Sequence, residues 1–437
     1  MPPLYMSVGR AMAIRFLHAA DVHLGYQQYK SKDRYNDFAR AFESMADDAL
    51  AQQVDFALLA GDLFNKRSIE PRTLLQASNT LQRLHDAGIP VIAIEGNHER
   101  SHYQDRFSWL DFLCEAGLLT LLDAPYVKGQ LQVLPWDDQS KMGTYVDLPG
   151  NVRVMGVKYH GASTPRVIQD LIPILEASSA SPTAYTILML HAGLEGVLDH
   201  YAGTVTRALL DQLHPYVDYL ALGHIHKPFI QDDWIYNPGS LETNSVDEAQ
   251  WSDRGYFIVD IDPSRKPPHT VSQIRGKRRR FERLSFSIDA YETPQELYDA
   301  LDTFLRDHAS TELVAQKPVV ELRLTGILAF SHADLDSAHI EDMVNEIMSP
   351  IVCNLKDLTT PSEFEIRLGE AMTRADLEQH VLRELLERDI RWRDDSERWT
   401  DMILNLKQMS LAGTAPEEII ARLDVFQGEM GRADHAS

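Results

Sequence analysis

Apolar and polar residues form two alternating kinds of block over the first 262 residues. Short apolar runs predict buried strands, and longer segments with an apolar residue at every third or fourth position predict helices. Strands and helices that alternate along a chain are typical of an α/β architecture. The predicted strands cover residues 14–18, 54–60, 91–95, 152–157, 185–191, 219–223 and 256–261.

Three helices are predicted between the early strands. Residues 37–52 and 71–87 repeat apolar residues on a helical period, and Gly88 is suited to end the second helix. A third helix is predicted over residues 108–119, with Trp109 near its start. Its apolar side chains fit either the core of their own domain or a dimer interface, and the sequence leaves both interpretations open.

The pattern changes after a proline-rich loop at residues 262–268. Two strands that alternate as half-buried strands do are predicted there, together with two helices, over residues 281–288, 319–324, 293–308 and 338–348. The remaining chain is predicted to be helical over residues 377–389, 396–409 and 416–430. We therefore predict an N-terminal extension, an α/β domain, a small α+β domain and a helical segment, at residues 1–12, 13–283, 284–360 and 361–437.

The composition is that of a globular protein, with 44% hydrophobic and 24% charged residues among 437. No apolar run reaches the roughly 18 residues of a membrane-spanning helix. The two cysteines, Cys114 and Cys353, match no zinc spacing and fit a reducing compartment, so we expect a cytoplasmic protein.

The net charge of −23 argues against a general polyanion binder. Basic residues concentrate in the run from Arg275 to Arg280. A solvated strand edge and a contact with phosphate groups are both compatible with this run.

Five short stretches rich in His, Asp and Asn each follow a predicted strand. They are Asp21-Val22-His23, Gly61-Asp62, Gly96-Asn97-His98-Glu99, His191-Ala192-Gly193 and Gly223-His224-Ile225-His226. A lone histidine after a strand is more often a capping or core residue than a ligand. Five such stretches at successive strand ends instead predict one metal site, because imidazole and carboxylate ligands suit manganese, iron or zinc.

These stretches, in the pattern DxH, GD, GNHE, HxG and GHxH, resemble those of the calcineurin-like metallophosphoesterases. Further stretches resemble their DNA-repair branch, the SbcD-type nuclease subunit that partners an SbcC-type ATPase. They are residues 18–25 (HAADVHLG), 61–64 (GDLF) and 237–242 (NPGSLE). The resemblance covers about residues 13–290 and implies the metallophosphoesterase fold, a two-sheet sandwich flanked by helices. It also implies a small DNA-capping domain and a helical tail.

The resemblance implies two divalent metal ions per chain, with Mn²⁺ favoured and Mg²⁺ or another divalent ion as the alternative. One ion would be held by Asp21, His23 and His226. The other would be held by Asn97, His191 and His224. Asp62 would bridge the two ions. His98 would be the non-ligand histidine that approaches the phosphate and acts in catalysis.

One position departs from the family pattern. Family members often carry a histidine three residues after the bridging aspartate, and here that position is Asn65. An amide can donate a hydrogen bond but cannot act as a general acid. Metal binding should survive the change, whereas the rate, or the balance of exonuclease and endonuclease cleavage, is the property that we expect it to affect. Further candidate substrate contacts, each also compatible with an exposed loop or edge residue, are Tyr26, Lys30, His102, Arg278, Arg279 and Arg280.

The sequence thus predicts a metal-dependent DNA exonuclease or endonuclease in an SbcC/SbcD-like complex for DNA end processing and repair. We expect DNA as substrate, an SMC-like ATPase bound by the C-terminal helices, a homodimer, no membrane, and a cytoplasmic location at the nucleoid. A phosphoesterase for small phosphodiesters or nucleotides shares every ligand and is one alternative. A DNA-end-binding scaffold with weak catalysis is another.

Overall fold

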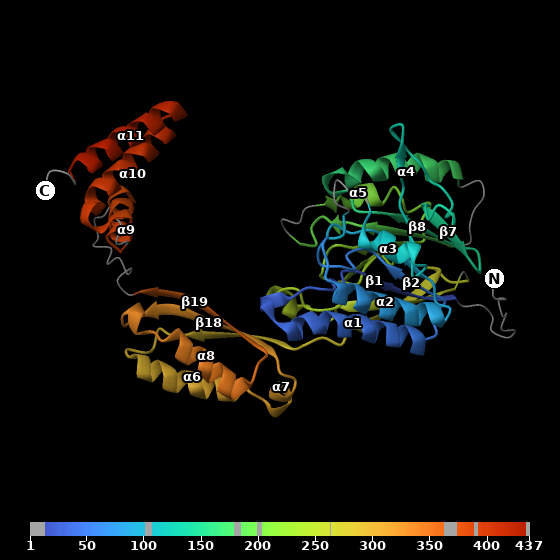
Figure 1. Cartoon of the computed structure of the whole chain (residues 1–437), viewed down its shortest axis with the longest axis horizontal. Helices are drawn as coiled ribbons and strands as arrows, with labels where there is room; N and C mark the ends of the chain where they lie inside the picture. The colour runs from blue at the N-terminus through green and yellow to red at the C-terminus, as the bar shows by residue number, and fades with distance from the viewer. Residues whose placement is uncertain are drawn as a thin grey trace. The chain divides into compact units, whose positions relative to one another are not determined.

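The computed structural model describes residues 14–100, 107–178, 185–198, 203–262, 264–361, 374–388 and 392–433 (Figure 1). The chain forms two compact units, residues 1–360 and 361–437. The predicted extension at residues 1–12 and the candidate His102 lie outside the described residues.

Two six-stranded sheets form the larger part of the first unit, which we call the catalytic module (residues 14–275). The first sheet has the strand order β16 (His269–Arg275), β15 (Gly255–Ile261), β1 (Ile14–Ala19), β2 (Phe56–Leu59), β3 (Val91–Ala93) and β4 (Thr120–Leu121). The second has the order β13 (Phe229–Gln231), β14 (Ile235–Asn237), β12 (Tyr219–Gly223), β9 (Tyr185–His191), β8 (Val152–Val157) and β7 (Tyr145–Leu148).

The two sheets pack face to face over a core of large apolar side chains. Phe16 stacks on Phe56 within the first sheet, with ring centroids 5.0 Å apart, and meets Tyr219 of the second sheet edge-on at 5.2 Å. Strands β1, β2 and β3 are parallel, as are β8, β9 and β12. Parallel strands are buried on both faces, which explains why these segments are continuous apolar runs.

Helices cover the outer faces of the sandwich, as predicted for this fold class. Side chains of the helices α1 (Lys32–Ala51), α2 (Pro71–Asp86) and α3 (Trp109–Glu115) pack with the first sheet. Those of α4 (Thr164–Ser178) and α5 (Arg207–Leu210) pack with the second. The predicted third helix is shorter than expected, because the chain turns at Gly117 with a φ of 74°.

A smaller module follows, with a three-stranded sheet and helices against one face. Its elements are β17 (Phe281–Ser287), α6 (Pro294–His308), α7 (Thr311–Ala315), β18 (Val319–Leu328), α8 (Ser337–Met348) and β19 (Val352–Pro361). The predicted boundary between residues 283 and 284 falls inside β17, whose partner is β18 along its whole length. Cutting there would break a paired strand, so we correct the boundary and propose that this module, called the capping module below, begins at Phe281.

In the part of the second unit that the structure describes, the chain forms the α-helices α9 (Arg374–Arg388), α10 (Ser396–Leu411) and α11 (Pro416–Ala433). Trp399 of α10 contacts both Trp392 and Phe426 through its ring, and these contacts tie the helices together. Among the helices that the structure describes, none combines the length and apolar character needed to cross a membrane.

Candidate metal centre

The predicted ligand stretches meet at one edge of the sandwich, where parallel strands of both sheets end. Asp21 follows β1, Asp62 follows β2 and Asn97 follows β3, while His191 ends β9 and His224 follows β12. Carboxyl ends of parallel strands form the usual crevice for ligands in α/β proteins. The structure therefore brings residues separated by up to 205 positions in sequence to one place.

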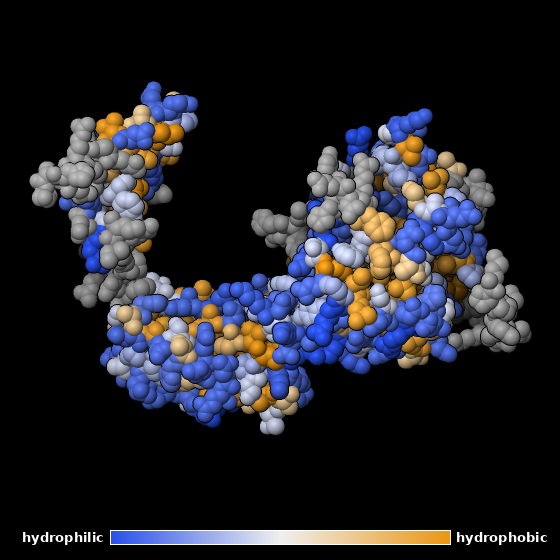
Figure 2. Space-filling view, in the orientation of Figure 1, coloured by the Kyte–Doolittle hydropathy of each residue, from blue (hydrophilic) through white to orange (hydrophobic). Residues whose placement is uncertain are grey.

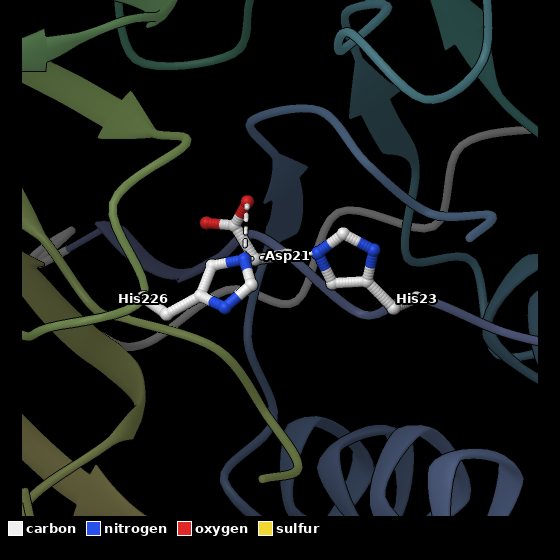
Figure 3. A group of neighbouring side chains, drawn as sticks. All are labelled: Asp21, His23 and His226. Carbon is white, nitrogen blue, oxygen red and sulfur yellow. Dashed lines mark hydrogen bonds and ion pairs between the residues drawn. The ribbon is translucent and has the colours of Figure 1, made fainter. Parts of the chain in front are cut away.

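The first cluster contains Asp21, His23 and His226, whose side chains point toward one another (Figure 3). The Nε2 atoms of His23 and His226 are 3.0 Å apart, and Nε2 of His226 lies 3.9 Å from Oδ1 of Asp21. The Asp21 carboxylate also accepts from the backbone N–H of His224, at 3.1 and 3.0 Å, which fixes its orientation.

The second cluster is formed by Asn97, His191 and His224. The Oδ1 atom of Asn97 lies 3.1 Å from Nε2 of His191 and 2.9 Å from Nδ1 of His224. Separations of about 3 Å are those expected between neighbouring ligands that bind one ion at about 2.1 Å in an octahedral arrangement.

Asp62 lies between the two clusters. Its Oδ2 atom is 3.9 Å from Nε2 of His23 in the first cluster and 3.2 Å from Nε2 of His191 in the second. Its side chain is 2% exposed, so the carboxylate needs buried positive partners. Asp62 therefore lies within reach of both clusters.

The lone pairs of His191, Asn97 and Asp62 are arranged as a cation would require. Nδ1 of His191 lies 2.7 Å from the carbonyl oxygen of Ala60, which can only accept, so Nδ1 carries the proton of the neutral ring. Its Nε2 lone pair then faces two oxygen atoms, from Asn97 and Asp62. Three acceptors facing one another in a buried site repel unless a cation or an added proton lies between them.

The amino-acid sequence matches known proteins over the same region. Residues 14–228 match the family model of the calcineurin-like phosphoesterases. The DNA double-strand break repair protein Mre11 of Aeropyrum pernix is 31% identical over 303 residues, which cover 67% of this chain and 67% of the relative. The chain belongs to the calcineurin-like phosphoesterase family, in its Mre11/SbcD branch.

With two other Mre11 proteins, the match covers about half of the relative's length. The Mre11 protein of Archaeoglobus fulgidus is 31% identical over 54% of this chain and 52% of its own. That of Methanosarcina acetivorans is 30% identical over 67% of this chain and 44% of its own. This calcineurin-like phosphoesterase therefore spans about half the length of these two relatives. Among solved structures, a dimetal phosphatase from Danio rerio matches with a TM-score of 0.37 and 11% identity. The match covers 57% of this chain and 92% of the phosphatase, and its TM-score is low.

Four of the candidate ligands of this phosphoesterase have a strained backbone. Asp21, His23, Asp62 and His224 all have positive φ, between 53° and 87°. Residues other than glycine rarely adopt this region, and such strain typically marks functional sites.

Glycines in the motifs leave space for the ligands. A Cβ atom on Gly96 would lie 2.0 Å from Oδ1 of Asp62, and one on Gly61 would lie 2.2 Å from Nδ1 of His191. Any side chain at either position would displace a ligand. The spacing of these glycines in the family motifs therefore has a steric reason.

Glu99 organises the loop around Asp62. Its buried carboxylate accepts from the backbone N–H groups of Asp62 at 3.1 Å, Phe64 at 2.8 Å and Gly96 at 3.0 Å. Burial, together with the Asp62 carboxylate, raises the pKa of Glu99 to about 8, although the backbone donors favour its ionised form. Glu99 stood in one of the motifs, but we did not predict its role, because its partners lie up to 37 residues away.

Glu248 holds His226 from behind. It lies in a short 3₁₀ helix, Val246–Gln250, and accepts from Nδ1–H of His226 at 2.7 Å. The proton on Nδ1 leaves the Nε2 lone pair facing the first cluster. A carboxylate in this position orients a metal-binding imidazole and makes it more basic. No motif pointed to Glu248.

The electrostatics of the centre favour positive charge beside Asp62. Burial lowers the pKa of His191, but the Asp62 carboxylate outweighs it and raises this pKa to about 9. Burial raises the pKa of Asp21 to about 6. In contrast, the surrounding imidazoles outweigh burial at Asp62 and hold its pKa well below the ordinary value. Bound cations would supply the same compensation as protonated imidazoles.

His98 lies beside this centre. Its Nδ1 atom is 2.6 Å from the carbonyl oxygen of Asn65, and its backbone N–H donates to Oδ1 of Asp62 at 3.0 Å. A side-chain nitrogen of His98 also lies within 4.8 Å of ligand atoms of His23 and Asp62. The predicted catalytic histidine and the predicted position of departure from the family are therefore in direct contact.

The other candidate substrate contacts have different surroundings. Tyr26 is half-buried, and its ring lies 5.4 Å from that of Phe38 beside the loop of the first cluster. Lys30 is exposed on the same loop. Arg280 has a side chain that is 61% exposed and pairs with Glu282.

Arg278 and Arg279 are engaged within the protein. Arg278 donates to the carbonyl oxygens of Arg254 and Ser252, the latter at 2.7 Å. Both carboxylate oxygens of Asp37 accept from Arg279, at 2.6 and 2.9 Å, and the side chain of Arg279 is 12% exposed. The structure therefore gives Arg279 an internal ion pair.

Proposed function

We propose that this chain hydrolyses phosphodiester bonds in DNA with the help of two divalent metal ions, Mn²⁺ being favoured. The observation that carries the proposal is the pair of ligand clusters that share Asp62. The mixture of imidazole, carboxylate and amide donors suits a borderline divalent ion such as manganese. Two bound cations stabilise the attacking and leaving oxygens of an in-line displacement at phosphorus.

Each cluster has its own ligands in this proposal. Asp21, His23 and His226 hold one ion. Asn97, His191 and His224 hold the other, and Asp62 contributes to both. Glu99 and Glu248 keep these ligands oriented without touching substrate.

His98 is the proposed proton donor. Because the carbonyl of Asn65 occupies Nδ1, the Nε2 atom is the one free to serve the reacting group. In its protonated form, His98 donates from Nε2 to a phosphoryl oxygen or to the leaving oxygen. Proton transfer of this kind and stabilisation of developing charge both lower the barrier.

Several features support DNA over a small phosphodiester as substrate. The relatives are named DNA double-strand break repair proteins. A groove of about 710 Å³ also lies where the catalytic and capping modules meet, and its lining includes Arg278, Arg280 and Arg283 with only two carboxylates, Asp247 and Glu282. A local excess of positive charge of this kind attracts a phosphate backbone even in an acidic protein.

Assembly and location are part of the same proposal. The helical segment at residues 361–437 docks on an SbcC-type ATPase, because side chains such as Leu411 (78% exposed) and Ile420 (59% exposed) leave apolar surface uncovered. The capping module at residues 281–360 contributes to DNA binding. We place the protein in the cytoplasm, at the nucleoid.

Two copies of the chain form a homodimer through α3 in this proposal. Phe107, Trp109 and Phe112 at this helix are 49%, 36% and 42% exposed, and an apolar patch is visible on this face of the catalytic module (Figure 2). Exposed aromatic clusters are enriched at protein interfaces.

A cleavage assay on blunt, nicked and hairpin DNA tests the proposal, with a small diester measured in parallel. Mn²⁺-dependent cleavage of DNA at a higher kcat/KM than that of the small diester is the expected result. The reverse preference would favour a phosphoesterase for small phosphodiesters or nucleotides. Complete absence of metal-dependent cleavage, with DNA ends still bound, would favour a DNA-end-binding scaffold.

A further inference from the structure

A continuous row of buried charged side chains starts at the metal ligand His226. Glu248 accepts from Nδ1–H of His226 through Oε1 at 2.7 Å, and its Oε2 accepts from Arg254 at 2.8 Å. Glu248 and Arg254 are 5% and 1% exposed. The orientation of the imidazole therefore depends on a carboxylate that is itself held by a buried guanidinium.

The row continues through the backbone and side chains of Glu242 and Thr243. Arg254 donates to the carbonyl oxygen of Glu242 at 3.1 Å and to the hydroxyl of Thr243 at 2.9 Å. From the other side, Arg34 donates to Oε1 of Glu242 at 3.2 Å and to the carbonyl oxygen of Thr243 at 2.8 Å. Two guanidinium groups thus clamp the same pair of residues.

The last links reach the capping module. Arg34 and Arg279 both donate to the carboxylate of Asp37, each with a shortest distance of 2.6 Å. Arg279 also donates to the carbonyl oxygens of Lys317 at 2.7 Å and Gln316 at 3.2 Å, in the turn before β18. One side chain therefore joins the start of α1 to the capping module.

Burial makes these links interdependent. Arg34, Asp37 and Glu242 are 0%, 4% and 1% exposed. A buried charge without its partner is strongly unfavourable, whereas apolar residues of similar size would stabilise a fold at least as well. A shift of one member therefore forces its neighbours to follow, and stability alone does not require charges here.

His226 is the ligand that such a row can influence. The Nδ1–H group of His191 is fixed by a backbone carbonyl, whereas that of His226 is fixed by the side chain of Glu248. Movement of Glu248 would turn the His226 ring and shift its Nε2 atom relative to Asp21 and His23.

We infer that Arg279 is a positioning residue for the metal centre. Arg279 responds to the position of the capping module and sets the orientation of His226. It acts through Asp37, Arg34, Glu242, Arg254 and Glu248. The inference rests on the proposed metal centre. It links metal binding at the first cluster, and the rate of cleavage, to a contact made by the capping module. Arg279 does not need to touch DNA for this.

The test compares Arg279→Gln with the wild-type full-length chain. Calorimetric titration with Mn²⁺ measures the two binding constants, and cleavage of a small phosphodiester measures kcat and KM without any need for DNA contacts. We expect about 2- to 30-fold weaker binding of one ion, with the other unchanged, and a lower kcat at nearly constant KM. Glu248→Gln should weaken the binding of the same ion by about 10- to 100-fold.

A matched control is available in the catalytic module. Arg153 makes a two-pronged ion pair with Asp147, at 2.7 and 2.8 Å, and its side chain is 23% exposed. Arg153→Gln removes the same kind of ion pair from the far end of β8 and should leave both Mn²⁺ affinities within about twofold, as expected for a partly exposed pair away from the metal centre. Arg279→Lys, which keeps the charge but loses the planar fork, should show a weaker form of the Arg279→Gln effect and serves as the second variant should the latter fail to fold.

The outcomes separate the inference from the proposal beneath it. Wild-type Mn²⁺ affinities and diester kinetics in Arg279→Gln, with only a lower melting temperature, would overturn the positioning role and leave the metal centre standing. If the wild-type chain bound no Mn²⁺, both would be overturned. A double-mutant cycle adds a further criterion, because Asp37→Asn and Arg279→Gln should be strongly non-additive in Mn²⁺ affinity, and additive effects would contradict the inference.

Discussion

The Nδ1 atom of His98 lies 2.6 Å from the backbone carbonyl oxygen of Asn65. A carbonyl oxygen can only accept, so the imidazole carries its proton on Nδ1 and directs Nε2 away from this contact. The residue that departs from the family pattern therefore holds the proposed catalytic histidine through an atom that every residue type possesses. The side chain of Asn65 can therefore be changed without removing this contact.

Replacing His98 by Ala should abolish cleavage and leave both metal ions bound. The substitution keeps the backbone N–H that donates to Asp62, so the shared ligand retains its contact. Loss of a positioned proton donor typically lowers kcat by about 10²- to 10⁴-fold. Single-turnover cleavage and Mn²⁺ titration check this, and full nuclease activity in the variant would discard the proposed role.

Replacing Asn65 by His should speed DNA cleavage. The backbone carbonyl that orients His98 is unchanged, and the new imidazole adds a group able to act as a general acid. The ratio of exonuclease to endonuclease products on a blunt duplex is the informative measurement, with Asn65→Ala as the control for the side chain alone. A variant no faster than the wild type would show that the departure at this position has no catalytic cost.

Replacing Asp62 by Asn should abolish high-affinity binding of both ions. The amide removes the one negative charge shared by the two clusters, while its shape stays nearly the same. Binding of a ligand to the native state raises the melting temperature, by an amount worth about 2.7 kcal/mol at a hundredfold excess over Kd. Mn²⁺ should therefore stabilise the wild type and not the variant. Asp86→Asn, at an exposed carboxylate on α2, is the control and should keep the full metal-dependent shift.

The residues that meet at the candidate metal centre were predictable because each belongs to a short local motif at the end of an apolar strand. The residues that orient the ligands were not. Glu248 lies 22 residues from His226, and Asp37 lies 242 residues from Arg279, so only the fold brings these partners together. Charged residues that end up buried look in sequence like ordinary surface residues.

The fold class was also predicted from local patterns, the apolar runs of the strands, and it is confirmed. Some elements were missed. The helix α4 contains Pro173, which weakens a helical prediction, and its position over the second sheet offsets that cost. The strand β19 carries Lys356 and Asp357 and lacks clear alternation, yet it pairs with β18. The sequence of β17 was predicted as a strand, but its partner was not, which explains the misplaced boundary at residue 283.

Truncation after Pro361 should abolish binding of an SbcC-type ATPase and preserve phosphodiesterase activity. The removed helices form a compact unit of their own, with Leu385 and Val425 51% and 53% exposed. Co-purification with the ATPase and cleavage of a small diester are the two measurements. Complex formation at the wild-type level would show that the tail is not the docking element.

Acid should destabilise the protein through His269. This buried residue bonds to the hydroxyl of Tyr185 through Nδ1 at 2.6 Å and to that of Tyr236 through Nε2 at 2.7 Å. Burial lowers the pKa of His269 to about 4, from 6.5 in its ordinary state. Between these two values the unfolded chain binds a proton that the folded chain does not.

The contribution of neutral His269 to the unfolding free energy is therefore complete above pH 6.5 and is lost as the pH falls toward 4. The total is about 3 kcal/mol, of which about 2 kcal/mol is lost by pH 5. His269→Gln keeps hydrogen-bonding atoms for both tyrosines but does not titrate. Urea unfolding at pH 7 and pH 5 should show a loss about 2 kcal/mol smaller in this variant than in the wild type. His85→Gln, at an exposed histidine of α2, should keep the wild-type difference, and equal losses in all three proteins would show that His269 accepts its proton without cost.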